Sequence, residues 1–261
     1  MRPIGVIGHL ARDVVAGAPP QIGGGPWHAG RALRTFRHDA IVVAKCGDAS
    51  LRPKLSSLGI PSTVTVDGAQ TGFSFSYDAD GVRTMAVESI GEPWRPEDVP
   101  DGTLRGVEWM QVAPLLRGDF DADMLAWLAR GRRLLLDAQG LVRRRELGPL
   151  VLDGDFDPAL LRHVDVLKLA DEEARAIIGD ADLESLRSLG VPEVLVTFGL
   201  KGSLVITPEL SVHVPAHPLD VDPTGAGDAY SVGYVAARAD GHAPVSAARR
   251  ATAVVAAMMH G

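Results

Sequence analysis

The sequence contains a single cysteine, Cys46, in 261 residues. One cysteine cannot form an intrachain disulfide, a CxxC redox pair or a zinc site built from cysteines. No uninterrupted apolar run is long enough to cross a membrane, and the N-terminus lacks the charged start and apolar stretch of a secretory signal. We therefore expect a cytoplasmic protein in a reducing compartment, with no membrane partner.

Two further absences narrow the classes of function. Basic residues are not in excess, at 26 Lys and Arg against 33 Asp and Glu, and they are scattered apart from the runs Arg143–Arg145 and Arg249–Arg250. This balance argues against a nucleic acid partner. The runs fit solvated helix faces, although the first could lie near a substrate phosphate or carboxylate. The Walker A pattern GxxxxGK[ST] does not occur, so a phosphate site would need a different loop.

Short apolar runs rich in β-branched residues recur along the chain with helical segments between them. A composition of 46% hydrophobic and 5% aromatic residues fits one soluble α/β domain. Continuous apolar runs suit parallel strands covered on both faces, which predicts a three-layer α/β/α sandwich with ligands at the carboxyl ends of its strands. Strands are predicted at 3–8, 40–47, 107–114, 132–139, 164–170 and 193–199, and helices at about 27–37, 119–130, 171–179, 182–189, 225–239 and 246–259.

One region breaks this rhythm of strands and helices. Residues 71–91 alternate apolar and polar positions around the turn signal Asp80-Gly81, which predicts a β-hairpin with one exposed face. It could form a small β lid, made by about 13–22 and 68–92 of a single domain 1–261, or be an ordinary edge hairpin. Its apolar face could pair with a second copy in a homodimer or cover the subunit's own substrate, and the sequence leaves both open.

The heptapeptide DPTGAGD, residues 222–228, opens a predicted helix. Gly225 and Gly227 allow a tight turn that points free N–H groups outward, where a helix start already favours an anion. Asp228 would lie beside that anion, where a kinase needs a carboxylate to accept the proton of an attacking hydroxyl. The plain alternative is a helix start with permissive turn residues, but the bracketing acids favour phosphoryl transfer.

DPTGAGD resembles the second signature, DTxGAGD, of the ribokinase or phosphofructokinase-B family of small-molecule kinases, and the likeness extends over nearly the whole chain. The resemblance implies a ribokinase-like fold, with ATP and Mg²⁺ as cofactors. It also implies that Asp228 is the catalytic base and that Gly225, Ala226 and Gly227 form the anion hole for the phosphoryl group. Thr224, Gly225 and Gly227 would contact the phosphates of ATP.

Two N-terminal stretches resemble the family's acceptor site. IGHLARDVV is similar to the strand and turn that hold an acid against substrate hydroxyls, which implies that Asp13 binds substrate, although it could be a turn residue. GGGPWHAGRAL is similar to the first signature, GGxGxNxA, and would bring Gly24 and Gly25 close to the substrate. Pro26 and His28 depart from it, because His28 replaces the sugar-binding asparagine. His28 can still bond a polyol or can merely start a helix.

Two later stretches resemble the donor site. DVLKLADEEARAIIG is similar to the NxxE segment: Glu173 matches the glutamate and would hold Mg²⁺ through water, while Ala170 replaces the asparagine. Lys168 and Asp171 are nearby polar candidates that could simply flank a helix start. VTFGLKGSLV resembles a strand that ends in a glycine turn under the nucleotide, and a plain hairpin turn is the alternative. The resemblance implies an ATP site that includes Thr197, Gly199, Gly202 and Thr252.

Within the family, LKLADEEA and LLLDAQGLVR are most similar to the myo-inositol kinase-like branch. This resemblance implies that Asp137 and Gln139 contact substrate at the carboxyl end of a strand. The predicted function is ATP-dependent transfer of the γ-phosphoryl group to a hydroxyl of a polyol or sugar, with myo-inositol as the favoured acceptor. The alternatives are a nucleoside kinase of the same family and a ligand-binding protein that has lost catalysis on the same fold.

Overall fold

The computed structural model describes residues 2–77, 83–216 and 224–260. The predicted turn Asp80-Gly81, and Asp222 and Pro223 of the heptapeptide, lie outside the described residues, as do the side chains of Tyr77, Arg83 and His260. In the described ranges, no helix is both long enough and apolar enough to span a membrane.

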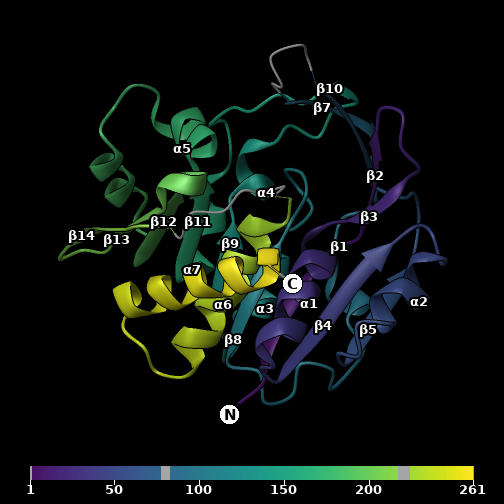
Figure 1. The fold of residues 1–261 in the computed structure, drawn as a ribbon, viewed down its shortest axis with the longest axis horizontal. Coiled ribbons are helices and arrows are strands. Elements are labelled where there is room, and N and C mark those ends of the chain that lie inside the picture. Colours follow the sequence, from purple (N-terminus) through teal and green to yellow (C-terminus); the bar gives the residue numbers. More distant parts are fainter. Residues whose placement is uncertain (1, 78–82, 217–223, 261) are drawn as a thin grey trace.

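A nine-stranded, mostly parallel sheet forms the middle layer of the molecule (Figure 1). The six predicted strands are present and pair in parallel. Three further strands were not predicted: β5 and β14, the short and partly buried edges of the sheet, and β13, which pairs antiparallel between β12 and β14. The strands in sheet order are β14 (Ser211–Val214), β13 (Ser203–Ile206), β12 (Glu193–Thr197), β11 (Val166–Ala170), β9 (Arg133–Asp137), β8 (Trp109–Ala113), β1 (Ile4–His9), β4 (Ala40–Cys46) and β5 (Ser62–Val66).

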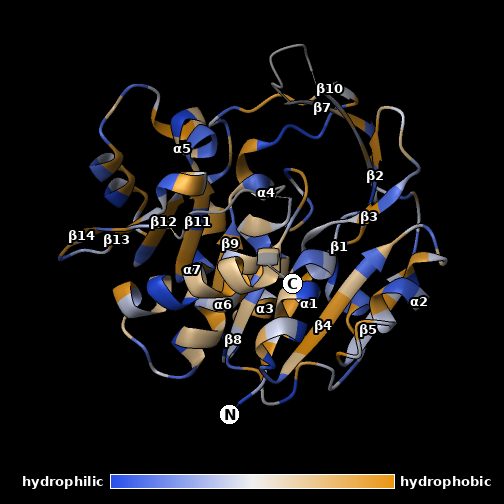
Figure 2. Cartoon of the chain, in the orientation of Figure 1, coloured by the Kyte–Doolittle hydropathy of each residue, from blue (hydrophilic) through white to orange (hydrophobic). Residues whose placement is uncertain are grey.

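Helices cover both faces of this sheet, which confirms the predicted sandwich. One apolar core lies between the sheet and α1, α2, α6 and α7, and a second lies on the opposite face against α3, α4 and α5. Hydrophobic colour accordingly concentrates in the strands (Figure 2). The helices are α1 (Gly25–Phe36), α2 (Leu51–Ser56), α3 (Ala122–Leu128), α4 (Gln139–Val142), α5 (Asp171–Ile178), α6 (Ala226–Ala239) and α7 (Pro244–His260).

Four shorter segments are 3-10 helices rather than α-helices. The segment predicted as a helix at 182–189 is one of them, with Asp182 as its N-cap, accepting from Glu184 N at 2.9 Å, and Gly190 as its C-cap. These 3-10 helices are Pro96–Asp98, Pro158–His163, Leu183–Leu189 and Gly199–Lys201.

A second, five-stranded sheet stands beside the first and contains the predicted hairpin. β6 and β7 pair antiparallel, and Phe73 and Phe75 on β6 turn toward the main body together with Met85 on β7. The outer face is polar, with Ser76 and Thr84 bonded at 2.6 Å. The strands in order are β10 (Gly148–Pro149), β7 (Arg83–Ser89), β6 (Gly72–Tyr77), β2 (Ala11–Val15) and β3 (Gln21–Gly23).

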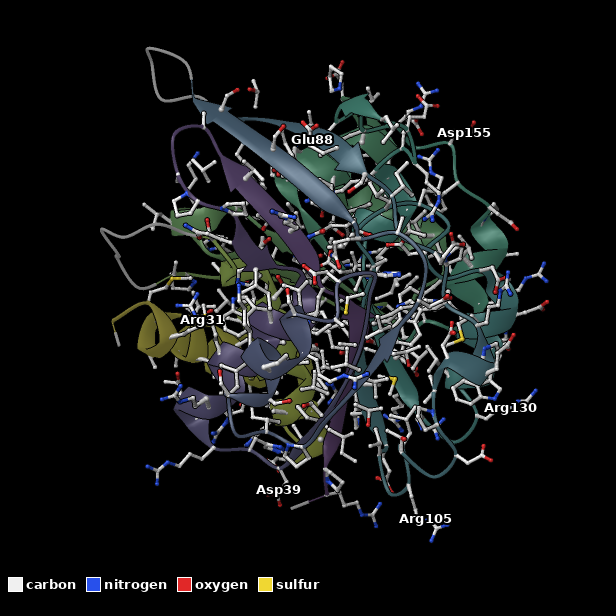
Figure 3. All side chains as sticks on the ribbon, turned by 90° about the vertical axis from the view of Figure 1, so that its right-hand side faces the viewer. Arg31, Asp39, Glu88, Arg105, Arg130 and Asp155 are labelled. Carbon is white, nitrogen blue, oxygen red and sulfur yellow. The ribbon has the colours of Figure 1, made fainter. Side chains whose placement is uncertain are left out.

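The chain reverses direction across the large sheet at β1. It first adds β4 and β5 on one side of β1 and then β8, β9, β11 and β12 on the other. The crevice beside such a reversal, outside the carboxyl ends of the strands, is the usual ligand site of open α/β sheets. Charged side chains such as Arg105 and Arg130 project outward at the periphery instead (Figure 3).

The close approach of β1 to β8 depends on a glycine. A Cβ at Gly8 would lie 2.3 Å from the carbonyl oxygen of Ala113, a backbone atom that cannot step aside. We expect Gly8→Ala to lower the free energy of unfolding by about 1–3 kcal/mol in urea titrations. Gly5→Ala on the same strand is the matched control, because its Cβ would meet only side-chain atoms of Met110 and Val107. Equal costs for the two variants would contradict this account.

Candidate active site

A cavity of about 510 Å³ opens at the carboxyl ends of β1, β8, β9 and β11, beneath the small sheet. Its walls are polar on the side of the large sheet and apolar under the small sheet, where Phe73, Phe75 and Met85 lie. Many of the residues predicted from the sequence line this cavity: Asp13, Gly24, Gly25, His28, Gln139, Glu173, Thr224, Gly225, Gly227 and Asp228.

The start of α6 forms one wall. Gly225 precedes the helix with a φ of 83°, a conformation that favours glycine, and a Cβ there would lie 2.4 Å from Nδ1 of His28. The ring of His28 therefore packs directly on the turn. Ala226 and Gly227 follow in the first turn, whose N–H groups have no partner within the helix and favour an anion. The wall thus has the form of an anion-binding helix start.

Asp228 lies in the same turn and is partly buried in the cavity. Its carboxylate reaches toward α1, because a Cβ at Gly25 would lie 3.0 Å from Asp228 Oδ1. Burial, followed by the charge of Asp137, raises the pKa of Asp228 to about 7, while Lys168 and Arg143 oppose the rise. A carboxylate that titrates near neutral pH is well matched to accept a proton from a hydroxyl group.

Lys168 and Asp137 form a buried ion pair under this turn. They are direct neighbours on the paired strands β11 and β9, and Lys168 Nζ donates to Asp137 Oδ2 at 3.1 Å. Burial alone would lower the pKa of Lys168, but Asp137, Glu173 and Asp228 outweigh it and raise the pKa. A Cβ at Gly227 would lie 3.1 Å from Nζ, so a permanently charged ammonium group faces the helix start.

Glu173 and Arg143 complete the charged end of the cavity. Glu173 Oε2 accepts from the backbone N–H of Ala170 at 2.8 Å, which ties it to the start of α5. Burial raises the pKa of Glu173, and Lys168 opposes this. Arg143, just beyond α4, brings its Nη2 within 4.0 Å of Glu173 Oε1. The cations Lys168 and Arg143 and the carboxylate of Glu173 therefore line the cavity together with Asp228.

The predicted residues beyond this cavity have other surroundings. Asp137 is buried beneath the cavity and holds Lys168 instead of lining the wall. The hydroxyl of Thr197 donates to Leu169 O at 3.1 Å, and that of Thr252 donates to Ala248 O at 3.0 Å within α7. Among the described residues that line the cavity there is neither of these two threonines, nor Gly199 or Gly202 at the turn between β12 and β13.

Sequence reasoning underused three features of this site. Lys168 was only one of several polar candidates, and Arg143 was only part of an arginine run. For the apolar face with Phe73, Phe75 and Met85, the sequence allows two roles: a contact with a second copy of the chain or a cover over the substrate. The signal for Lys168 was available, because a lysine inside the apolar run VLKLA of a buried strand requires a nearby carboxylate.

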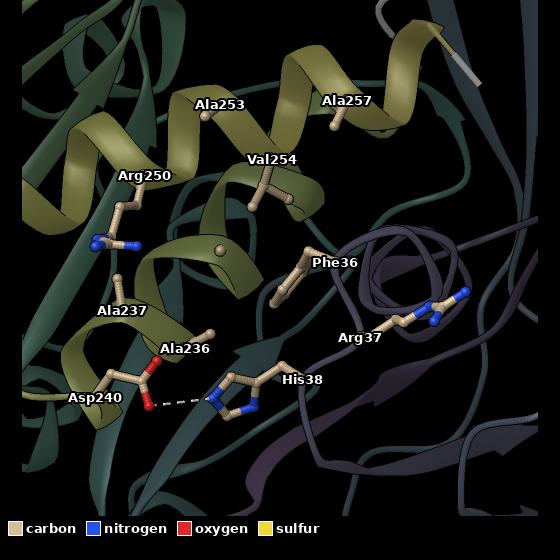
Figure 4. Close-up of a pocket in the computed structure, with 11 residues that line it drawn as sticks. Phe36, Arg37, His38, Ala236, Ala237, Asp240, Arg250, Ala253, Val254 and Ala257 are labelled. Atoms are coloured by element: carbon tan, nitrogen blue, oxygen red, sulfur yellow. Dashed lines mark ion pairs between the residues drawn. The ribbon is translucent and has the colours of Figure 1, made fainter. Parts of the chain in front are cut away.

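A second cavity, of about 380 Å³, lies between α1, α6 and α7 (Figure 4). Its walls are mainly small apolar side chains around Phe36, with His38 Nε2 facing Asp240 Oδ1 at 3.7 Å. It is at the C-terminal end of α6, away from the anion-binding turn. Glycine turn, base and buried lysine meet only in the first cavity among those that the described residues form, so we place the chemistry there.

Residues 154–260 match the model of the pfkB family of carbohydrate kinases. This part of the chain is therefore similar to a family of carbohydrate kinases. The matched region contains Lys168, Glu173 and the turn with Asp228, whereas the acceptor side of the cavity lies in the preceding part of the chain.

Relatives extend the similarity beyond the matched region. The chain is 26% identical over 223 residues to an ATP-dependent ribose-1-phosphate kinase of Halopiger xanaduensis, which covers 82% of this chain and 72% of that protein. It is 26% identical to a solved pyrophosphate-dependent kinase of the ribokinase family, with a TM-score of 0.83 over 98% of this chain and 95% of the other. The fold is therefore ribokinase-like.

A further solved structure supports the fold alone. It is a pyrophosphate-dependent kinase of the ribokinase family complexed with a pyrophosphate analogue and myo-inositol, at 24% identity. Its TM-score is 0.84, over 98% of this chain and 95% of that chain.

The raised pKa of Asp228 predicts a pH-dependent cost to stability. The folded carboxyl group holds its proton up to about pH 7, whereas the unfolded one loses it near its usual value of 3.8. The contribution of this group to the free energy of unfolding is therefore fully present below pH 3.8 and is lost as the pH rises from there through 7. We expect Asp228→Asn, compared with wild type, to gain on the order of 2–3 kcal/mol of unfolding free energy between about pH 5 and 8. A difference in urea titrations that is independent of pH would contradict the raised pKa.

Proposed function

We propose that this protein is a kinase that transfers a phosphoryl group to a hydroxyl of a cyclic polyol or sugar, with myo-inositol as the first acceptor to test. One observation carries the proposal: Asp228, whose pKa is about 7, lies in the first turn of α6 beside free N–H groups, and the ammonium group of the buried Lys168 faces that turn at Gly227. A proton acceptor next to an anion site is the arrangement that phosphoryl transfer to an alcohol requires.

In the proposed mechanism the acceptor lies between α1 and the small sheet, which includes β2. Asp13, His28 and Gln139 provide groups that can bond hydroxyls, and Phe75 and Met85 offer an apolar surface to the C–H face of a ring. Asp228 accepts the proton of the attacking hydroxyl. The amides of Gly225, Ala226 and Gly227, with the Lys168 ammonium group, would stabilise the phosphoryl oxygens as charge develops on them.

The small sheet acts as the lid in this proposal. Its apolar face is directed toward the cavity, while the outer face bears Ser74, Ser76 and Thr84. Closing it over a bound acceptor would exclude water, which otherwise competes with the acceptor hydroxyl for the phosphoryl group.

The residues present are compatible with a magnesium ion that is held largely by the donor's phosphates and by water. No group of three or more His, Cys, Asp or Glu side chains that could bind a metal occurs within the described ranges. Glu173, a buried carboxylate at the charged end of the cavity, is the residue that would orient its water. When bound, the ion would neutralise charge across the donor phosphates.

ATP and pyrophosphate are both candidate phosphoryl donors, and different observations support each of them. ATP follows from the family signature and from the ATP-dependent relative. Pyrophosphate is favoured because the similar solved kinase is pyrophosphate-dependent. Thr197 and Thr252, expected near the nucleoside, bond backbone carbonyls of their own chain instead. Pyrophosphate is therefore the proposed donor, and ATP is the second candidate.

The acceptor and donor proposals are tested by one matrix of assays. Product formation is measured for inositols, pentoses, pentose 1-phosphates, hexoses and nucleosides, each with pyrophosphate and with ATP plus Mg²⁺. We expect kcat/KM for a cyclic polyol with pyrophosphate to exceed that with ATP by about tenfold or more. A higher kcat/KM with ATP than with pyrophosphate would identify ATP as the donor instead. A nucleoside preference by about two orders of magnitude would overturn the polyol acceptor.

The base is tested by substitution. We expect Asp228→Asn to lower kcat by about 10³-fold or more while acceptor binding changes little, because the amide keeps the shape of the side chain but cannot accept the proton. In wild type, kcat/KM should fall with decreasing pH below about 7. Asp240→Asn, at the far end of α6, is the control. Undiminished turnover by Asp228→Asn would remove Asp228 from the role of base, and a wild type that binds polyols without phosphorylating them would favour the ligand-binding alternative.

A further inference from the structure

Three consecutive arginines follow α4, and the structure gives each a different environment. Arg144 Nη2 donates to Glu146 Oε1 at 2.7 Å on the surface. Arg145 Nη1 donates to Asp119 Oδ1 at 2.6 Å and helps to fix the loop beneath the small sheet. Arg143 instead lines the cavity that contains Asp228. The run is therefore not a uniform solvated face, and only its first member reaches the site.

The guanidinium group of Arg143 is poorly satisfied for a group so deeply placed. Its side chain is 15% exposed, and its Nε is buried with no hydrogen-bond partner in the described part of the chain. Glu173 Oε1 is 4.0 Å from its Nη2, which is beyond hydrogen-bond length. A guanidinium group has five N–H donors and cannot lose its charge. The protein therefore provides no hydrogen-bonded anion for this group, and a bound anionic ligand could fill that role.

The two cations of the cavity differ in how firmly the protein holds them. The ammonium group of Lys168 is fixed by Asp137 at 3.1 Å, in strand register, and faces the turn at Gly227. Arg143 has no such anchor, but its charge acts on Asp228 and Glu173. A planar guanidinium can bind two oxygens of one phosphoryl group in parallel, which an ammonium group cannot do.

We propose that Arg143 is a catalytic residue whose guanidinium group binds two non-bridging oxygens of the phosphoryl group while that group passes from donor to acceptor. This inference rests on the proposed function. In the transfer, the acceptor oxygen forms a bond to phosphorus and the bridging P–O bond of the donor breaks. The bonding electron pair leaves with the departing phosphate of pyrophosphate, or with ADP, and the acceptor proton passes to Asp228. An arginine on the transferring group stabilises the charge that its oxygens carry at the transition state.

The test compares Arg143→Ala and Arg143→Lys with Arg144→Ala, the matched control from the same run. At saturating donor and acceptor, we expect Arg143→Ala to lower kcat by about 10²–10³-fold, with acceptor KM changed by less than about threefold. Arg143→Lys should recover a minor part of the rate, because an ammonium group restores the charge but cannot bind two oxygens of one phosphoryl group in parallel. Arg144→Ala should stay within about twofold of wild type.

Two further readouts separate catalysis from a structural role. Added guanidinium ion should raise the turnover of Arg143→Ala and leave Arg144→Ala unchanged. The acidic limb of kcat/KM should move to higher pH in Arg143→Ala, because loss of a nearby cation removes an influence that lowers the pKa of Asp228. A kcat within about threefold of wild type in Arg143→Ala would overturn the proposal. If Arg143→Ala does not fold, Arg143→Lys decides by the same criterion.

A binding measurement keeps this inference separable from the proposed function. We expect calorimetric titration of the full chain with pyrophosphate to give binding that Arg143→Ala weakens by about tenfold or more and Arg144→Ala does not. If wild type binds pyrophosphate but phosphorylates no acceptor, the proposed function fails while the role of Arg143 as a phosphate ligand stands. If Arg143→Ala binds and turns over like wild type, the inference fails while the proposed function stands.

Discussion

Lys168 Nζ and Asp137 Oδ2 meet at 3.1 Å beneath the first turn of α6, and the electrostatics of the cavity depend on this buried pair. The ammonium group would be costly to bury without its partner carboxylate. With it, a permanent positive charge is held beside the helix start, where a phosphate would bind. The same ammonium group limits how far burial and the charge of Asp137 raise the pKa of Asp228. The pair thus links the stability of the sheet to the protonation of the proposed base.

The topology explains how groups distant in sequence meet at one place. The chain reverses at β1, so the carboxyl ends of β1, β8, β9 and β11 open toward a common crevice. Thr224 and Gly225 at the start of α6 line that crevice, and the small sheet covers it with an apolar face. Each element contributes a different chemical group: Asp13 from β2, His28 from α1, Lys168 from β11 and Asp228 from α6. The result is polar where hydroxyls and phosphates would bind and apolar under the lid.

The fold was readable from sequence because its strands are continuous apolar runs and its main turn, GAG, needs glycines at fixed positions. The predicted helix at 182–189 is a 3-10 helix, which the pattern of apolar residues alone does not distinguish from a short α-helix. Thr252 was placed by analogy near the nucleotide, but its hydroxyl bonds Ala248 O of its own helix. Motif reading supplies a position along the chain, whereas the partner of a hydroxyl depends on local geometry.

The Lys168–Asp137 pair could not be read directly, because it depends on which residues of β11 and β9 are neighbours in the sheet. A lysine in an apolar strand required some carboxylate, but Asp137 was assigned to the substrate instead. The arginine run had the same limitation, since adjacent residues point to different partners once the backbone leaves α4. Long-range pairing, and not local pattern, determines these roles.

The central claim is that burial, followed by the charge of Asp137, raises the pKa of Asp228 to about 7 against the opposing charges of Lys168 and Arg143. Its most direct test is an NMR titration of side-chain carboxyl carbons, with the Asp228 signal assigned from its absence in Asp228→Asn. The account predicts a titration midpoint near pH 7, moved upward in Lys168→Met, where the opposing cation is lost. A midpoint at the ordinary aspartate value of 3.8, unmoved by that substitution, would contradict it.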